Sequence, residues 1–171
     1  MSIFPTKILL ATDGSEEASL AARTAVDLAD KTGSELHVAF VLRTQDVPDY
    51  DTMGFDIEKP HEEEVEEVEE IKQMGQRLLD EQVRRVEEAG GTVAGAHFRM
   101  MARPERGILA IGEDDGAGLI VLGSRGLGGI KRALMGSVSD SVVRHAHCPV
   151  LVVRKADNPD QEETDQEMLL A

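Results

Sequence analysis

The chain has 171 residues, of which 41% are apolar and 3% aromatic, with one cysteine and a formal net charge of −15. This length predicts a single domain with an aliphatic core, and the one cysteine, Cys148, excludes an intrachain disulfide framework. The negative charge disfavours binding to nucleic acid and to anionic membranes.

No apolar run is long enough to cross a bilayer, and residues 1–7 lack the pattern of a signal peptide, so we expect a cytoplasmic protein. Asp and Glu number 33, whereas Lys and Arg together number 18. This balance fits adaptation to a high-salt cytoplasm, where ions screen the repulsion between like charges. It equally fits an ordinary acidic protein that has one unusually acidic helix.

The first half of the chain predicts two strands and two helices. Residues 7–12 form an apolar run that ends at Asp13-Gly14-Ser15, which is typical of a buried strand followed by a turn. Ser15 then caps a helix with an alanine-rich face that ends at Gly33. A second strand covers 36–42 and a loop covers 43–60. A long helix spans 62–88, and we interpret its seven early glutamates as a solvated face rather than as a metal or partner site.

The second half continues the alternation. We expect strands at 92–100, 119–122 and 149–153, and helices at about 105–113 and 137–145. Residues 155–171 are acidic and are expected to form a disordered tail. The fold class is therefore α/β: an open, five-stranded, mainly parallel sheet with helices on both faces, in one domain over 1–154. A ligand site is expected beyond the carboxyl ends of the strands, where the strand order reverses.

A glycine-rich segment follows the fourth strand, from Gly123 to Ser139. Glycines let backbone N–H groups approach phosphate oxygens, and the helix that begins at Gly136-Ser137 favours an anion at its N-terminus. We expect Ser137 to cap this helix, with Asp140 completing a capping box. Arg125 and the pair Lys131-Arg132 add local positive charge. The segment matches neither the phosphate loop of the common nucleoside triphosphatases nor the dinucleotide fingerprint.

The spacing of this segment resembles the nucleotide-binding signature of the universal stress protein family: Gly123, two residues, Gly126, nine residues, then Gly136-Ser137. The Asp13-Gly14-Ser15 turn and the segment 148–153 are also similar to that family, and the likeness covers roughly 4–154. It implies a Rossmann-like fold of the adenine nucleotide alpha-hydrolase type. It also implies binding of ATP, accompanied by a divalent ion such as Mg²⁺ or Mn²⁺.

The resemblance assigns roles to individual residues. Asp13 would contact the ribose with Thr12 beside it, and the backbone of Val41 would meet the adenine edge. The residues that would surround the phosphates are Gly123, Arg125, Gly126, Gly136, Ser137, Val138 and Ser139. Two structural alternatives remain open: Asp13 as a turn cap, and the glycines as parts of a tight loop.

The remaining titratable residues receive structural interpretations. We expect His37 to be a half-buried core or edge residue, and His145 and His147 to lie at the surface near a helix end. His61 and His97 have no evident partner in the sequence, and Cys148 is expected to be a small packed residue.

No catalytic motif of a known local pattern occurs in the sequence, so we expect a nucleotide-dependent regulatory or stress-response switch with little or no turnover. The alternatives are an interaction protein of the same fold without nucleotide binding, and a slow ATPase. We also expect a homodimer. The last strand, Val150, Leu151, Val152 and Val153, is apolar and would leave an open sheet edge unless a second copy covers it, as is common in the family.

Overall fold

The computed structural model describes residues 2–44, 62–127 and 135–155, with the backbone alone for 62–67. Most of the predicted 43–60 loop, the Lys131-Arg132 pair and the predicted tail beyond Lys155 lie outside these ranges. Within them, strands and helices alternate in the predicted order. The elements are β1 (Lys7–Thr12), α1 (Glu16–Thr32), β2 (Glu35–Arg43), α2 (Glu62–Glu88), β3 (Val93–Met101), α3 (Pro104–Asp115), β4 (Leu119–Gly123), α4 (Ser137–His145) and β5 (Val150–Val153).

The five strands form one sheet in the order β3-β2-β1-β4-β5, and every neighbouring pair is parallel. This arrangement confirms the predicted α/β fold class. The chain builds the sheet outward from β1 through β2 to β3, then returns to β1's other side with β4. The strand order therefore reverses between β1 and β4, which is where such sheets open a crevice for ligands.

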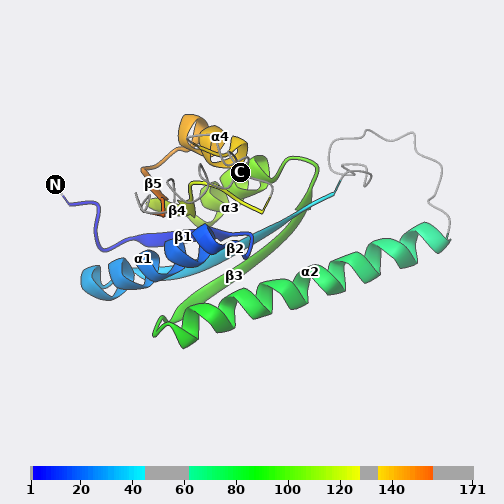
Figure 1. Ribbon diagram of the computed structural model, residues 1–171, viewed down its shortest axis with the longest axis horizontal. Helices are drawn as coiled ribbons and strands as arrows, with labels where there is room; N and C mark the ends of the chain where they lie inside the picture. The colour runs from blue at the N-terminus through cyan, green and yellow to red at the C-terminus, as the bar shows by residue number, and fades with distance from the viewer. Residues whose placement is uncertain (1, 45–61, 128–134, 156–171) are drawn as a thin grey trace, which may run out of the picture.

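Two helical layers cover the sheet, with α1 and α2 below it and α3 and α4 above it in Figure 1. The alternation of side chains along β1 separates the core into two parts. Ile8 and Leu10 pack with α1 and α2, whereas Leu9 and Ala11 pack with α3 and α4. All four are almost fully buried. A strand buried on both faces explains why the sequence of β1 is a continuous apolar run.

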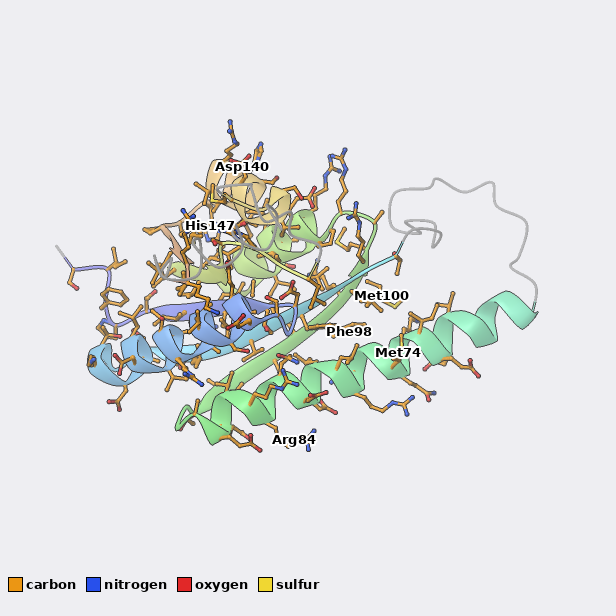
Figure 2. The ribbon with its side chains drawn as sticks, in the orientation of Figure 1. Met74, Arg84, Phe98, Met100, Asp140 and His147 are labelled. Carbon is orange, nitrogen blue, oxygen red and sulfur yellow. The ribbon has the colours of Figure 1, made fainter. Side chains whose placement is uncertain are left out.

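The packing of α2 on β3 depends on a close approach at Gly75. A Cβ atom at this position would collide with the ring of Phe98, which projects from β3 toward α2 (Figure 2). The three- and four-residue spacing of apolar residues along this helix allows either Met74 or Gly75 to face inward. The structure buries Gly75 and leaves Met74 47% exposed, so the glycine provides the contact surface.

None of the helices in the described ranges combines the length and the apolar character that a membrane span requires.

Candidate functional site

The carboxyl ends of β1 and β4 lie side by side at the reversal of the strand order. The register pairs Ala11 with Leu122, so the turn after Thr12 and the loop after Gly123 leave the sheet at the same level. These are the two segments that contain the predicted site motifs. The topology therefore brings together residues that are more than 100 positions apart in the sequence.

The turn after β1 is organised by the Asp13 carboxylate. Its Oδ1 atom accepts a hydrogen bond from the backbone N–H of Ser15, at 3.0 Å. Ser15 in turn caps α1, because its hydroxyl oxygen accepts from the N–H of Ala18 at 3.2 Å. This geometry is an Asx turn that leads directly into a capped helix. The structural role considered for Asp13 is thus present, and one carboxylate oxygen remains for other contacts.

The second oxygen of Asp13 reaches the loop after β4. Its Oδ2 atom accepts a hydrogen bond from the backbone N–H of Leu127 at 2.9 Å. A Cβ atom on Gly126 would collide with that same oxygen, so the contact requires a glycine there. The Asp-Gly-Ser turn and the glycine-rich loop therefore form one continuous site. Each carboxylate oxygen has two lone pairs, so Asp13 retains acceptor capacity for hydroxyl groups of a ligand.

Glu17 holds the beginning of the same loop. Its Oε2 atom accepts from the Ser124 hydroxyl at 2.5 Å and from the Arg125 backbone N–H at 2.6 Å. The Nε atom of Arg125 lies 3.8 Å from Oε1 of Glu17. Arg125, which the sequence indicates as a source of local positive charge, is therefore paired with a carboxylate. Sequence reasoning missed this role because a glutamate in the first turn of a helix is explained by the helix dipole alone.

The N-terminus of α4 is attached to the loop through the carbonyl oxygen of Ser124. This oxygen accepts from the backbone N–H of Gly136 at 2.7 Å and from the Ser139 hydroxyl at 2.8 Å. Ser139 is buried by these contacts. As in any helix, the first N–H groups of α4 have no acceptor within the helix itself, and groups of this kind can bind an anion.

The predicted cap of α4 was wrong in one respect. The cap residue is Gly136, with an extended backbone, and Ser137 is the first helical residue. The cap glycine has no side chain that could accept from the helix, and the Asp140 carboxylate accepts from Arg144 Nε, at 2.9 Å. The helix begins one residue earlier than a cap at Ser137 would place it, because the Ser124 carbonyl accepts from the Gly136 N–H and fixes Gly136 as the cap. Ser137 is exposed and Val138 half-buried, in the first turn of α4.

Thr12 and Val41 have side chains that point away from this loop. The Thr12 hydroxyl bonds to Gln82 of α2 at 3.3 Å. The Val41 side chain packs against Gly107 of α3. Its backbone nevertheless lies near the carboxyl end of β1, because the preceding residue, Phe40, is paired with Thr12. A cavity of about 350 Å³ between α1 and α2 has Thr12 in its lining but none of the loop residues. This cavity therefore does not include the loop after β4.

Comparison with known proteins finds a matching family and related sequences. A model described as the universal stress protein family matches residues 5–154. The chain is 34% identical over 151 residues to Universal stress protein MJ0531 of Methanocaldococcus jannaschii, which covers 87% of this chain and 82% of that protein. It is also 34% identical to Universal stress protein YxiE of Bacillus subtilis, which covers 86% of this chain and 98% of that protein.

Solved structures share the fold. Hypothetical protein MJ0577 superimposes with a TM-score of 0.70 at 24% identity, over 91% of this chain and 99% of that one. A universal stress protein in complex with cAMP gives a TM-score of 0.59 at 23% identity, over 90% and 99%. A universal stress protein from Archaeoglobus fulgidus in complex with dAMP gives 0.55 at 21% identity, over 89% and 99%. Two of these neighbours thus bind adenine nucleotides.

Proposed function

Because the chain belongs to the universal stress protein family, we propose that it binds ATP, together with a divalent ion, in the crevice between the carboxyl ends of β1 and β4. The nucleotide acts as a regulatory switch with little or no turnover. The observation that supports this most directly is the hydrogen bond from the Leu127 N–H to the Asp13 carboxylate, because it unites the two motifs in one site.

Each part of the nucleotide has a matching chemical environment in this site. The remaining lone pairs of Asp13 accept the ribose hydroxyls, and the Val41 backbone meets the adenine edge. The phosphates bind at the N-terminus of α4, where the N–H groups of Ser137, Val138 and Ser139 and the helix dipole favour negative charge. Neighbours solved with cAMP and dAMP support an adenine nucleotide as the ligand.

A divalent ion fits the donor set at this end of the sheet. The Asp13 carboxylate offers the hard oxygen ligands that Mg²⁺ and Mn²⁺ prefer, and phosphate oxygens supply the rest. The ion would neutralise charge on the phosphates next to two carboxylates. Both carboxylates also hold the loop, since Glu17 accepts from the Arg125 N–H and Asp13 from the Leu127 N–H.

A switch requires that ATP bind one conformation more tightly than another, so that the nucleotide shifts the population. The loop after β4 is the part of the site whose contacts a phosphate can replace, since Asp13 and Glu17 hold it through only a few hydrogen bonds.

Calorimetric titration with MgATP tests the proposal. We expect Asp13→Asn to weaken ATP binding about tenfold or more, because a hydrogen bond to a charged acceptor contributes about 1.5–3 kcal/mol. Asp30→Asn, which changes an exposed carboxylate on α1, is the matched control and leaves the affinity unchanged. The proposal fails if folded wild-type protein does not bind ATP, or if both variants bind it equally well. Steady-state phosphate release measures the turnover.

A second candidate is an interaction protein of the same fold that does not bind nucleotide. The observation in its favour is that the N–H groups of Arg125 and Leu127 already have carboxylate acceptors within the chain. The same titration separates the two candidates, because an interaction protein of this kind gives no heat of ATP binding.

We further propose that two copies pair along β5. This strand lies at the edge of the sheet, and all four of its side chains are partly buried against the core. An apolar edge of this kind is a site of strand pairing unless something covers it. The oligomeric state and its dependence on β5 are tested by the edge variant described in the Discussion.

A further inference from the structure

Three side chains with metal-binding chemistry meet at the opposite end of the sheet from the nucleotide crevice. They are His37 from the beginning of β2, His97 from β3 and Asp115, the last residue of α3. His37 is paired with Leu9 and His97 with Ala39, so both imidazoles lie on the face of the sheet that α3 covers. The cluster includes none of the residues assigned to nucleotide binding.

We propose that His37, His97 and Asp115 bind one divalent transition-metal ion, with Zn²⁺ preferred. The ligand atoms are His37 Nδ1, His97 Nε2 and Asp115 Oδ2. Zinc is bound tetrahedrally with nitrogen and oxygen ligands about 2.0–2.2 Å away, which places neighbouring ligand atoms about 3.3–3.6 Å apart. The observed separations are 3.3 Å between the two nitrogens, and 2.7 Å and 3.7 Å from Oδ2 to His37 and His97, respectively.

Hydrogen bonding alone does not satisfy the three groups. The Nδ1 atom of His37 is close to both His97 Nε2 and Asp115 Oδ2, but an N–H on that atom is directed to one acceptor at a time. Asp115 Oδ2 is in fact buried without a hydrogen-bond partner, although the imidazole lies 2.7 Å away. An ion in place of the shared proton would contact all three atoms at once.

Metal-binding side chains in proteins are usually oriented by further polar groups next to them, and both His37 and Asp115 have such neighbours. The carboxylate of Glu35 lies 3.4 Å from Nε2 of His37, which is otherwise buried without a partner. A carboxylate beside the distal nitrogen favours the tautomer that leaves Nδ1 free to bind metal. Lys7 lies 3.4 Å from Oδ1 of Asp115 and donates to its backbone carbonyl at 3.0 Å, which leaves Oδ2 facing the imidazoles.

The His37 ring lies close to the backbone of β3 because residue 95 is a glycine. A Cβ atom on Gly95 would lie 2.5 Å from Nδ1 of His37, the proposed ligand atom. Gly95→Ala therefore fills the space next to that atom while it retains all three ligands. The donor set of two imidazoles and one carboxylate suits Zn²⁺ better than Mg²⁺, which prefers oxygen ligands only.

Calorimetric titration of the metal-free, untagged, full-length chain with Zn²⁺ tests the site, with Mg²⁺ titrated separately. We expect one Zn²⁺ per chain and no comparable binding of Mg²⁺. Loss of a carboxylate that hydrogen-bonds to a ligand usually weakens metal binding about 10–100-fold, so we expect Glu35→Gln to lower the Zn²⁺ affinity by such a factor. His97→Gln and Asp115→Asn each remove a ligand atom, so they should lower the affinity further. Gly95→Ala should also weaken binding. His145→Gln, on the exposed end of α4, and Glu88→Gln leave the affinity unchanged.

Nitrogen NMR of the histidine side chains provides an independent readout. On addition of Zn²⁺ we expect His37 to respond at Nδ1 and His97 at Nε2, whereas His145 does not respond. Circular dichroism establishes that each variant is folded, and the exposed Glu35→Gln remains informative if a ligand variant does not fold. The proposal is overturned if wild type binds no Zn²⁺, if His97→Gln and Glu35→Gln bind it as wild type does, if Mg²⁺ binds equally well, or if His145→Gln abolishes binding.

Discussion

At the scale of single residues, Glu17 contributes most to the geometry of the loop after β4. Its side chain is 13% exposed and accepts from both Ser124 and Arg125. Glu17→Ala leaves these donors without partners, so we expect the free energy of unfolding to fall by about 1–3 kcal/mol. Denaturant titration measures this change. Glu16→Ala, at a neighbouring exposed position, should have little effect, and equal destabilisation by both would contradict the assigned role.

The thiol of Cys148 is the second residue for which the structure makes a definite prediction. Burial raises the pKa of Cys148 above its ordinary value, so the reactive thiolate is scarcer at neutral pH than for a free cysteine. We expect Cys148 to react with a thiol reagent more slowly than free cysteine at pH 8, with the rate still rising at higher pH. A rate equal to that of free cysteine in the folded protein would contradict this.

At the scale of elements, the contact between α2 and β3 gives the sharpest test of packing. Alanine at position 75 gains about 1 kcal/mol of helix propensity over glycine, but a core that is forced to accept extra atoms loses about 1–3 kcal/mol. Because the new Cβ would collide with the Phe98 ring, we expect Gly75→Ala to lower the melting temperature.

Reducing the size of residue 98 provides the control. In the background of Phe98→Leu, which removes the ring, the same Gly75→Ala change should cost less or become stabilising. A cost that is the same in both backgrounds would show that the ring is not its cause.

The elements themselves were largely predictable from the sequence, and the reasons are local. The bounds of α2 and α4 agree with those expected from apolar spacing, and the left-handed Gly33 ends α1 as predicted. The cap of α4 was mispredicted because a tertiary contact, the bond from Gly136 to Ser124, decides where that helix begins. Local preference alone favoured Ser137.

The candidate site was predictable only in part. The glycine spacing indicated the loop, and the Asp-Gly-Ser turn indicated its partner, because parallel topology brings strand ends together. The bonds of Glu17 to Ser124 and Arg125 span more than 100 residues and leave no periodic signal in the sequence. The same is true of His37 and His97, whose proximity follows from the register of β2 with β3.

At the scale of the whole molecule, the open edge of the sheet predicts the assembly. The carbonyls of Pro149 and Val153 bond to β4, so the alternation along β5 turns the backbone of Val152 to the open edge. We expect a dimer in solution, and Val152→Pro should make it monomeric because the outward N–H is lost. Analytical ultracentrifugation measures this.

An exposed apolar residue outside β5 serves as the comparison. Val143 on α4 is 44% exposed, and Val143→Ser should leave the dimer intact. A monomeric wild type, or a dimer that is lost with Val143→Ser but kept with Val152→Pro, would exclude pairing through β5.

The net charge of −15 predicts a stability that depends on salt. Raising KCl from about 0.1 M to about 1 M shortens the screening length from about 10 Å to about 3 Å. We expect the melting temperature to rise over this range, because repulsion among carboxylates is reduced, and to change much less with an uncharged osmolyte. A melting temperature that does not respond to KCl would contradict the high-salt interpretation.

The carbonyl of Ser124 has a consequence for how the glycine-rich segment can vary. This oxygen accepts hydrogen bonds from the Gly136 N–H and the Ser139 hydroxyl. Leu127, three residues after Ser124, donates its N–H to the Asp13 carboxylate. The two residues that flank the intervening stretch, Leu127 and Gly136, are thus each held by a backbone hydrogen bond. Adding or removing a residue between them changes closure entropy only slightly. A deletion series through that stretch would therefore report what binding of the proposed nucleotide requires, separately from what the fold tolerates.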